Sequence, residues 1–195
     1  MVVAALFIID VQNDFTEGGA LGVVGGAAVA ANITNFLWAN AEHYCVIIAS
    51  RDWHDAHNDN GGHFATDAAP NFVDTWPVHC VAGTYGADYH PALNTEQISM
   101  HVRKGQGVPA YSIFEGTTND GETVLSVLDR LEIERIEIAG IATDYCVLAS
   151  AMDAVATGRT VSVLTHLIAG VAPESSAAAL ETMKEAGITL VSGNE

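Results

Sequence analysis

The chain has 195 residues, 49% of them hydrophobic, and its 24 acidic against seven basic residues give a formal net charge of −17. This length suits one domain with a full core, so we expect residues 1–195 to form a single domain. The charge would repel nucleic acid and anionic membranes, and no apolar run reaches the roughly 18 residues of a membrane span, which excludes both kinds of partner.

Strand-like and helix-like segments alternate along the chain, which is typical of βαβ units with helices on both faces of a sheet. We expect strands at residues 4–10, 45–51, 98–103, 135–141, 160–166 and 188–192. Helices are expected at residues 27–42, 123–131, 145–156 and 174–186, the last opened by Pro173 and closed by Gly187. The apolar residues 1–9 lead into Asp10 without a cleavage site, which indicates a strand rather than a signal peptide.

Four chemically active side chains fall at the ends of predicted strands. Asp10, Asp52, Lys104 and Cys146 each follow one of the first four strands. In an open α/β sheet, ligands bind outside the carboxyl ends of the strands, where the winding reverses. We therefore expect these four side chains to converge on one crevice.

Cys146 is the candidate nucleophile. It lies where the buried strand 136–141 passes into an Ala-rich helix, and the unpaired N–H groups and dipole of a helix N-terminus favour thiolate over thiol. With Asp10 to take the proton and Lys104 to stabilise the thiolate, the pattern predicts acyl transfer. Each of these residues also has a structural interpretation without catalysis. Cys146 could be a small buried hydrophobe, Asp10 a strand-end cap, and Lys104 part of an exposed turn before Gly105.

The three cysteines, Cys45, Cys80 and Cys146, are too few for a disulfide framework. They indicate a reducing compartment, and we expect the protein to be cytoplasmic.

The long segment 52–93 lacks periodicity and is rich in histidine. Asp52 with two or three of His54, His57, His63 and His79 could bind Zn²⁺, Fe²⁺ or Mn²⁺, with water completing the shell. The spacing matches no structural zinc finger, and a histidine-rich surface loop without metal is the alternative. So long a loop in a compact domain usually has a function.

Three aromatic residues accompany this loop and the neighbouring turns. Phe15, Trp76 and Tyr111 could form flat apolar walls of a cleft, although aromatic residues in loops are more often ordinary packing.

Several ordered motifs support a family resemblance that covers nearly the whole chain. Residues 8–15 read IIDVQNDF, residues 76–84 WPVHCVAGT, residues 111–116 YSIFEG, and residues 140–147 GIATDYCV. Together they resemble the cysteine hydrolases of the isochorismatase-like fold, and within them the nicotinamidase/pyrazinamidase group. The resemblance implies a three-layer α/β/α fold with a six-stranded, mainly parallel sheet in the order 3-2-1-4-5-6.

The resemblance also implies catalytic roles. Asp10 would be the general base and later acid, Lys104 would support the thiolate, and Cys146 would attack a carboxamide carbon. The backbone N–H groups of Ala142 and Cys146 would form the oxyanion hole, with a cis peptide bond at Ile141–Ala142. The implied reaction converts nicotinamide to nicotinate and ammonia, and pyrazinamide to pyrazinoate, through a thioester.

One divalent metal ion, Zn, Fe or Mn, is the implied cofactor. Its ligands would be Asp52, His54, His63 and His79, with His57 as a competing loop ligand because the register there is ambiguous. The small-molecule carboxamide would lie among Phe15, Trp76 and Tyr111.

One departure and two alternatives accompany the resemblance. Tyr145 replaces a histidine often found before the nucleophile in similar members of this group, which affects fine substrate preference rather than mechanism. Another family amidase acting on a carbamoyl or ureido compound is the alternative enzyme, although such relatives generally lack the metal cluster. A catalytically idle metal-binding protein is the other alternative. Relatives range from monomers to larger assemblies, so a homo-oligomer is left open.

Overall fold

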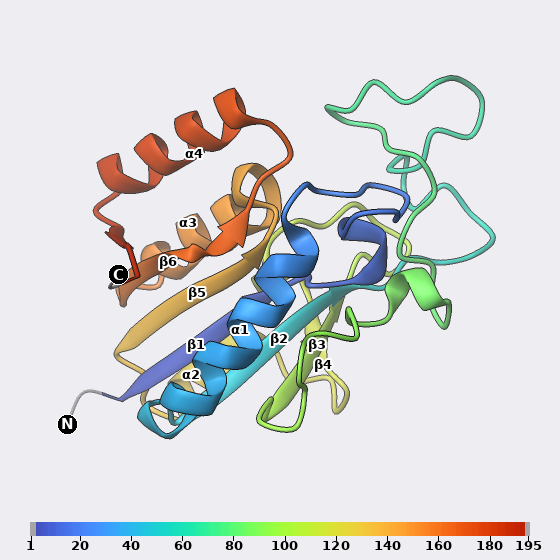
Figure 1. Ribbon diagram of the computed structural model, residues 1–195. Helices are drawn as coiled ribbons and strands as arrows, with labels where there is room; N and C mark the ends of the chain where they lie inside the picture. The colour runs from blue at the N-terminus through green and yellow to red at the C-terminus, as the bar shows by residue number, and fades with distance from the viewer. Residues whose placement is uncertain (1–2, 194–195) are drawn as a thin grey trace.

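The computed structural model describes residues 3–193, and within them a seven-stranded sheet forms the centre of the fold (Figure 1). The order is β4-β3-β2-β1-β5-β6-β7, and every pair is parallel except β3 with β4. The strands are β1 (Ala4–Ile9), β2 (Val46–Asp52), β3 (Met100–Lys104), β4 (Thr117–Thr118), β5 (Arg135–Ile141), β6 (Thr160–Ala169) and β7 (Thr189–Val191).

The six predicted strands are all present and keep the predicted relative order, so the predicted α/β fold is confirmed. The sheet differs in having a seventh strand, β4, which adds an antiparallel edge beyond β3. A strand of two residues carries no periodicity, which is why the sequence did not predict it.

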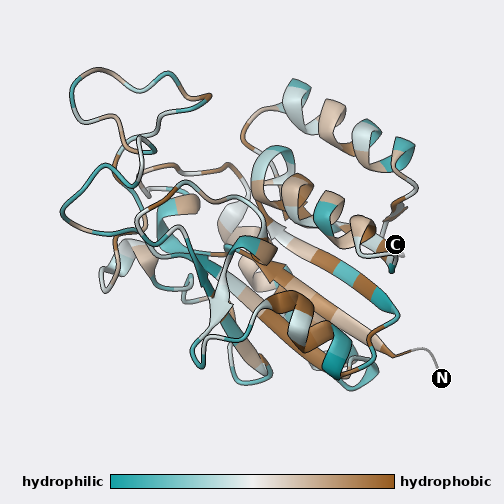
Figure 2. Ribbon diagram, turned by 180° about the vertical axis from the view of Figure 1, so that it is seen from behind, coloured by the Kyte–Doolittle hydropathy of each residue, from teal (hydrophilic) through white to brown (hydrophobic). Residues whose placement is uncertain are grey.

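Helices cover both faces of the sheet (Figures 1 and 2). They are α1 (Gly26–Asn40), α2 (Val124–Arg130), α3 (Leu148–Ala156) and α4 (Pro173–Glu185). Helix α1 packs on one face, whereas α2, α3 and α4 pack on the other. The helix predicted from residue 145 differs at its start, because Thr143–Val147 form a π-helical turn before α3 begins.

Strand β1 lies at the middle of the sheet, and all six of its residues are buried. Successive side chains point to opposite faces. Thus Phe7 and Ile9 pack with α2 and α3, while Leu6 and Ile8 pack with α1. Burial on both faces explains why the strand is a continuous apolar run rather than an alternating one.

The winding of the sheet reverses at β1, which has β2 on one side and β5 on the other. The carboxyl ends of these strands therefore open onto a shared crevice, and β3 ends next to β2 at the same edge. Within residues 3–193, no helix is long and apolar enough to cross a membrane.

Candidate active site

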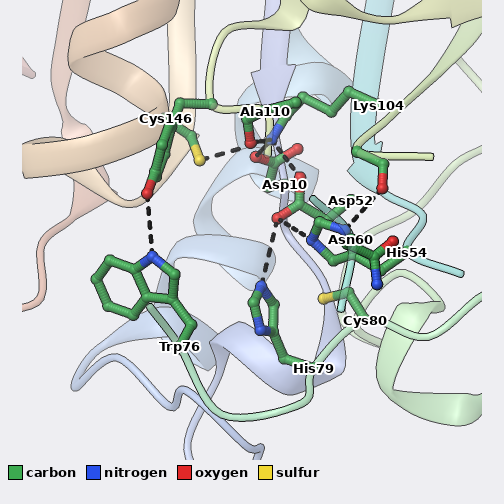
Figure 3. A network of polar contacts seen from close by, with 12 residues as sticks. Asp10, Asp52, His54, Asn60, Trp76, His79, Cys80, Lys104, Ala110 and Cys146 are labelled. Carbon is green, nitrogen blue, oxygen red and sulfur yellow. Dashed lines mark hydrogen bonds and ion pairs between the residues drawn. The ribbon is translucent and has the colours of Figure 1, made fainter. Parts of the chain in front are cut away.

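Lys104 is the centre of the polar cluster in this crevice (Figure 3). Its side chain is fully buried, and Nζ lies 2.9 Å from Asp10 Oδ2 and also contacts Asp52 Oδ1. The same ammonium is 3.6 Å from Cys146 Sγ and 3.4 Å from the carbonyl oxygen of Ala110. The structure thus brings together the four strand-end side chains that the sequence singled out.

The charges in this cluster are strongly coupled. Burial alone would lower the pKa of Lys104, but the carboxylates of Asp10 and Asp52 raise it well above its ordinary value, so the side chain is an ammonium. Burial also opposes ionisation of Asp52, yet Lys104 and the adjacent imidazoles hold the pKa of this carboxyl well below its usual range. Burial raises the pKa of Asp10, despite the opposing effect of Lys104, which makes it the better base of the two.

The thiol of Cys146 is buried as well. Burial raises its pKa well above the ordinary value, and the nearby charge of Lys104 opposes this shift. The helix terminus and Lys104, both evident from the sequence, favour the thiolate, whereas burial favours the thiol. The thiol therefore keeps its proton at rest and needs a base to remove it.

Two further residues hold Asp10 and Asp52 in place, Ser50 through the Asp10 carboxylate and Gln12 through the Asp52 backbone, and neither role was predicted from the sequence. Ser50 Oγ donates a 2.7 Å hydrogen bond to Asp10 Oδ1, and both side chains are fully buried. Gln12 Oε1 accepts a hydrogen bond from Asp52 N at 2.8 Å, while its Nε2 donates to the carbonyl oxygens of Asp52 and Ala87 at 2.9 Å. Gln12 could have been noticed because it belongs to the polar residues directly after β1. Ser50 lies within an apolar strand, so nothing in the sequence pointed to a role for it.

The turn that carries Cys146 begins directly after β5. The Ile141–Ala142 peptide bond is cis, as the resemblance implied. Ala142 lies just before the π-helical turn, and its carbonyl oxygen accepts hydrogen bonds from the N–H groups of Tyr145 and Val147. Ala142 and Cys146 both line the cavity described below.

Three buried histidines form a second cluster beside Asp52. The candidate ligand atoms of His54, His63 and His79 lie within 4.8 Å of one another. Asp52 Oδ2 is 3.6 Å from His54 Nε2 and 3.8 Å from His79 Nε2. The competing residue, His57, is exposed and lies outside this group.

The orientation of these imidazoles suits a metal ion. His54 Nδ1 is 2.7 Å from the carbonyl oxygen of Gly105, and His79 Nδ1 is 2.7 Å from that of Pro77, so each Nδ1 donates to a carbonyl oxygen and each Nε2 is directed toward Asp52. Burial lowers the pKa of His63 to about 4, which keeps that ring neutral.

Two buried nitrogen atoms, His54 Nε2 and His63 Nδ1, have no hydrogen-bond partner. Buried polar atoms are seldom left unpaired, and neutral imidazoles with a carboxylate are typical ligands of Zn²⁺, Fe²⁺ or Mn²⁺. The residues present therefore fit a divalent ion.

Short backbone pairings hold these histidines in place. His54 pairs with Val81, next to the His79 segment, and Phe64 pairs with Trp76. Gly105 is required beside them, because φ is +76° and a Cβ atom would lie 2.5 Å from the His54 ring.

Both clusters open into one cavity of about 390 Å³. Cys146 lies in its wall together with Asp52, His63 and His79. The three aromatic residues singled out from the sequence also line it, and Trp76 Nε1 donates a 3.0 Å hydrogen bond to Tyr111 Oη. The Cys146 thiol and the histidine cluster thus lie in the wall of one largely apolar cavity.

Comparison with known proteins shows what the chain is similar to. The family model described as the isochorismatase domain matches residues 4–195. The nicotinamidase/pyrazinamidase of Mycobacterium tuberculosis is 45% identical over 187 residues, which cover 96% of this chain and 97% of that protein.

Two solved structures are similar over nearly their whole length. The pyrazinamidase of Pyrococcus horikoshii in complex with zinc has a TM-score of 0.82 and 34% identity, covering 97% of this chain and 99% of that one. PnC1 from L. infantum in complex with nicotinate has a TM-score of 0.82 and 32% identity, covering 98% of this chain and 93% of that one.

Proposed function

The chain belongs to the isochorismatase family, and from that premise we propose that it is a nicotinamidase/pyrazinamidase. It hydrolyses nicotinamide to nicotinate and ammonia, and pyrazinamide to pyrazinoate and ammonia. The observation that carries this function is the single cavity shared by the Cys146 cluster and the three-histidine cluster. A nucleophile and a ring-orienting group on facing walls suit a heteroaromatic carboxamide.

Acylation begins with proton transfer from the Cys146 thiol to Asp10, the carboxylate whose pKa burial raises. The sulfur then attacks the carboxamide carbon, and the N–H groups of Ala142 and Cys146 stabilise the oxyanion. Asp10 returns its proton to the departing nitrogen as the C–N bond breaks, so ammonia leaves and a thioester remains. Lys104 balances the negative charge that passes between sulfur and carboxylate.

Deacylation uses the same groups. Asp10 takes a proton from water while the water oxygen attacks the thioester carbon, and the C–S bond then breaks. The proton returns to sulfur, the acid is released, and the thiol is regenerated. Ser50 holds the Asp10 carboxylate in one orientation for both steps.

We propose that Asp52, His54, His63 and His79 hold one divalent ion, Zn²⁺, Fe²⁺ or Mn²⁺. When bound, this ion would supply Lewis acidity that orients the ring nitrogen of the substrate. Phe15, Trp76 and Tyr111 enclose the ring. The three free cysteines support our placing the enzyme in the reducing cytoplasm.

An ammonia-release assay tests this function. Metal-analysed protein is incubated with nicotinamide, pyrazinamide and a ureido compound, and the acid product is identified by chromatography. We expect equimolar ammonia and acid from the two heteroaromatic carboxamides and none from the ureido compound. Turnover of the ureido compound alone would instead assign the chain to another amidase of the family.

A further inference from the structure

The cavity is larger than the substrates named above require. Cavities of roughly 300–1,000 Å³ enclose drug-sized ligands, whereas nicotinamide is a single pyridine ring with a carboxamide. The volume of about 390 Å³ therefore leaves room beyond one ring. The walls are largely apolar, so that room suits a hydrocarbon group.

The residues that line the cavity include a buried group and an exposed group. Cys146, His63 and His79 are buried, and Trp76 is only 6% exposed. Tyr145 and Phe72 lie edge-on to the Trp76 ring, with centroids 5.1 Å and 6.1 Å away. We call Phe72, Tyr145 and Val171 the outer wall. Phe72 is 52% exposed and Val171 is 55% exposed, so this part faces the mouth of the cavity.

The turn that presents Phe72 is well braced. Asn71 Oδ1 accepts hydrogen bonds from the N–H groups of Val73, Asp74 and Thr75, at 2.8–3.0 Å. The backbone N–H of Phe72 itself donates to the carbonyl oxygen of Thr75 at 3.1 Å. Tyr145 Oη donates a 3.4 Å hydrogen bond to the Phe72 carbonyl oxygen, which joins two residues of the outer wall.

Val171 is braced from the opposite side. The carboxylate of Asp144 accepts hydrogen bonds from the N–H groups of Val171 and Ala172 at 2.9 Å and 3.2 Å, and from the Ser175 hydroxyl. Asp144 is two residues before Cys146, so one short segment fixes both the nucleophile and the outer wall. A preformed apolar surface loses little freedom when a ligand binds to it.

Resting on the proposed function, we propose that the outer wall is a subsite for an apolar substituent on the ring of the carboxamide substrate. The substrate class then extends from nicotinamide to alkyl-substituted and fused bicyclic nicotinamides. An anionic substituent would not be accepted, because the outer wall offers it no cation and the chain carries a net charge of −17.

The test compares kcat/KM for a quinoline carboxamide with kcat/KM for nicotinamide. We expect the ratio to be near or above one in the wild-type enzyme, and below one for an analogue with a carboxylate substituent. Val171→Asp and Phe72→Ser should each lower the ratio about tenfold, the scale on which a hydrophobic pocket distinguishes small apolar groups. Phe72→Leu keeps an apolar surface, so its ratio should be close to that of the wild-type enzyme.

Val73→Ser is the matched control, because Val73 lies on the same turn, is 67% exposed and does not line the cavity. It should leave both rates unchanged. A wild-type ratio far below one, or equal ratios in Val171→Asp and Val73→Ser, would overturn the subsite while nicotinamide turnover still supports the proposed function. If the wild-type protein hydrolysed neither substrate, the proposed function itself would be contradicted.

Discussion

The cavity is built by two regions that are held in different ways. The strand-end region carries Asp10, Lys104 and Cys146 at the carboxyl edge of β1, β3 and β5, where continuous parallel ladders fix the backbone. The loop region, residues 53–99, carries His63 and Trp76 and is joined by isolated backbone pairings and side-chain hydrogen bonds. The groups that we propose make and break bonds thus lie on the rigid scaffold, whereas His63 and Trp76, which we propose orient the ring, lie on the loop.

Asp52 is one link between these regions. It is the last residue of β2, and its Oδ1 contacts Lys104 while its Oδ2 faces the imidazoles of His54 and His79. A change in one region can therefore reach the other through this carboxylate, as well as through the contact of His54 Nδ1 with the Gly105 carbonyl oxygen. The two regions can be separated experimentally by changes that avoid Asp52.

The largest effect is expected at the nucleophile. Cys146→Ala removes the atom that forms the thioester, so ammonia release from nicotinamide should fall to the background rate. Metal content should remain at the wild-type level, because no histidine is touched. Cys45→Ala, at an exposed cysteine outside the cavity, is the control and should keep full activity. Turnover in Cys146→Ala would contradict the proposed mechanism.

Removing the charge at the centre of the strand-end region should be nearly as severe. Lys104→Met leaves two buried carboxylates without their cation, so we expect kcat to fall at least about a hundredfold. Stability should also drop by about 3–5 kcal/mol, measurable by denaturant unfolding.

Asp10→Asn separates catalysis from folding in the same cluster. It removes the base but keeps a side chain of the same shape, so a similar loss of kcat should come with a much smaller loss of stability. Equal stability losses in Asp10→Asn and Lys104→Met would show that the ammonium is no more central to the cluster than the Asp10 carboxylate.

Changes in the loop region should reduce metal binding and leave the reactivity of the Cys146 thiol intact. His54→Ala and His79→Ala should lose both the ion and activity, His63→Ala should bind the ion more weakly, and His57→Ala should change neither. Metal content per chain in the four variants is the measurement. Labelling of Cys146 by a small electrophile should continue in all four. Full occupancy in His63→Ala with loss in His57→Ala would reverse the ligand assignment.

How much could be predicted from sequence also differs between the regions. Strand periodicity and strand-end position suffice to bring Asp10, Lys104 and Cys146 together, because a parallel sheet has one carboxyl edge. Periodicity says nothing about residues 53–99, where the pairing of Phe64 with Trp76 depends on tertiary contacts. The choice between His57 and His63 was accordingly left open by the residues alone.

Fine geometry was beyond sequence reasoning in both regions. The π-helical turn at Cys146 differs from an α-helix by hydrogen-bond register rather than by residue type. Ser50 lies within an apolar strand, and only the twist and pairing of β1 and β2 bring its hydroxyl to Asp10.

Ser50→Ala should act on the strand-end region alone. The variant removes the hydrogen bond to Asp10 Oδ1, and a bond to a charged group contributes about 1.5–3 kcal/mol, of which only part affects the transition state. We expect kcat to fall about tenfold, with KM and metal content unchanged. Ser50→Thr keeps a hydroxyl group and should recover most of the rate. A change in KM without a change in kcat would assign Ser50 to substrate binding instead.

The smallest effect on turnover is expected from the loop turn at Asn60. The side-chain oxygen of Asn60 accepts hydrogen bonds from the N–H groups of Asp55 and Gly107, and its side-chain nitrogen donates to the carbonyl oxygens of Asp55 and Asn58. The backbone carbonyl oxygen of Asn60 accepts a hydrogen bond from the N–H group of His63. Asn60→Ala removes the amide and places Ala at φ +50°, which L-residues disfavour.

Asn60→Gly removes the same amide but tolerates this φ, so the two variants separate hydrogen bonding from backbone conformation. Both should keep kcat within about threefold when saturated with metal, because the strand-end region is untouched. Both should release the ion to a chelator faster than the wild-type enzyme, since the turn before His63 opens more often, and Asn60→Ala should release it fastest. If both variants release metal at the wild-type rate, the loop is held by the backbone pairings at His54 and Phe64, and the two regions are more alike in rigidity than their hydrogen bonding indicates.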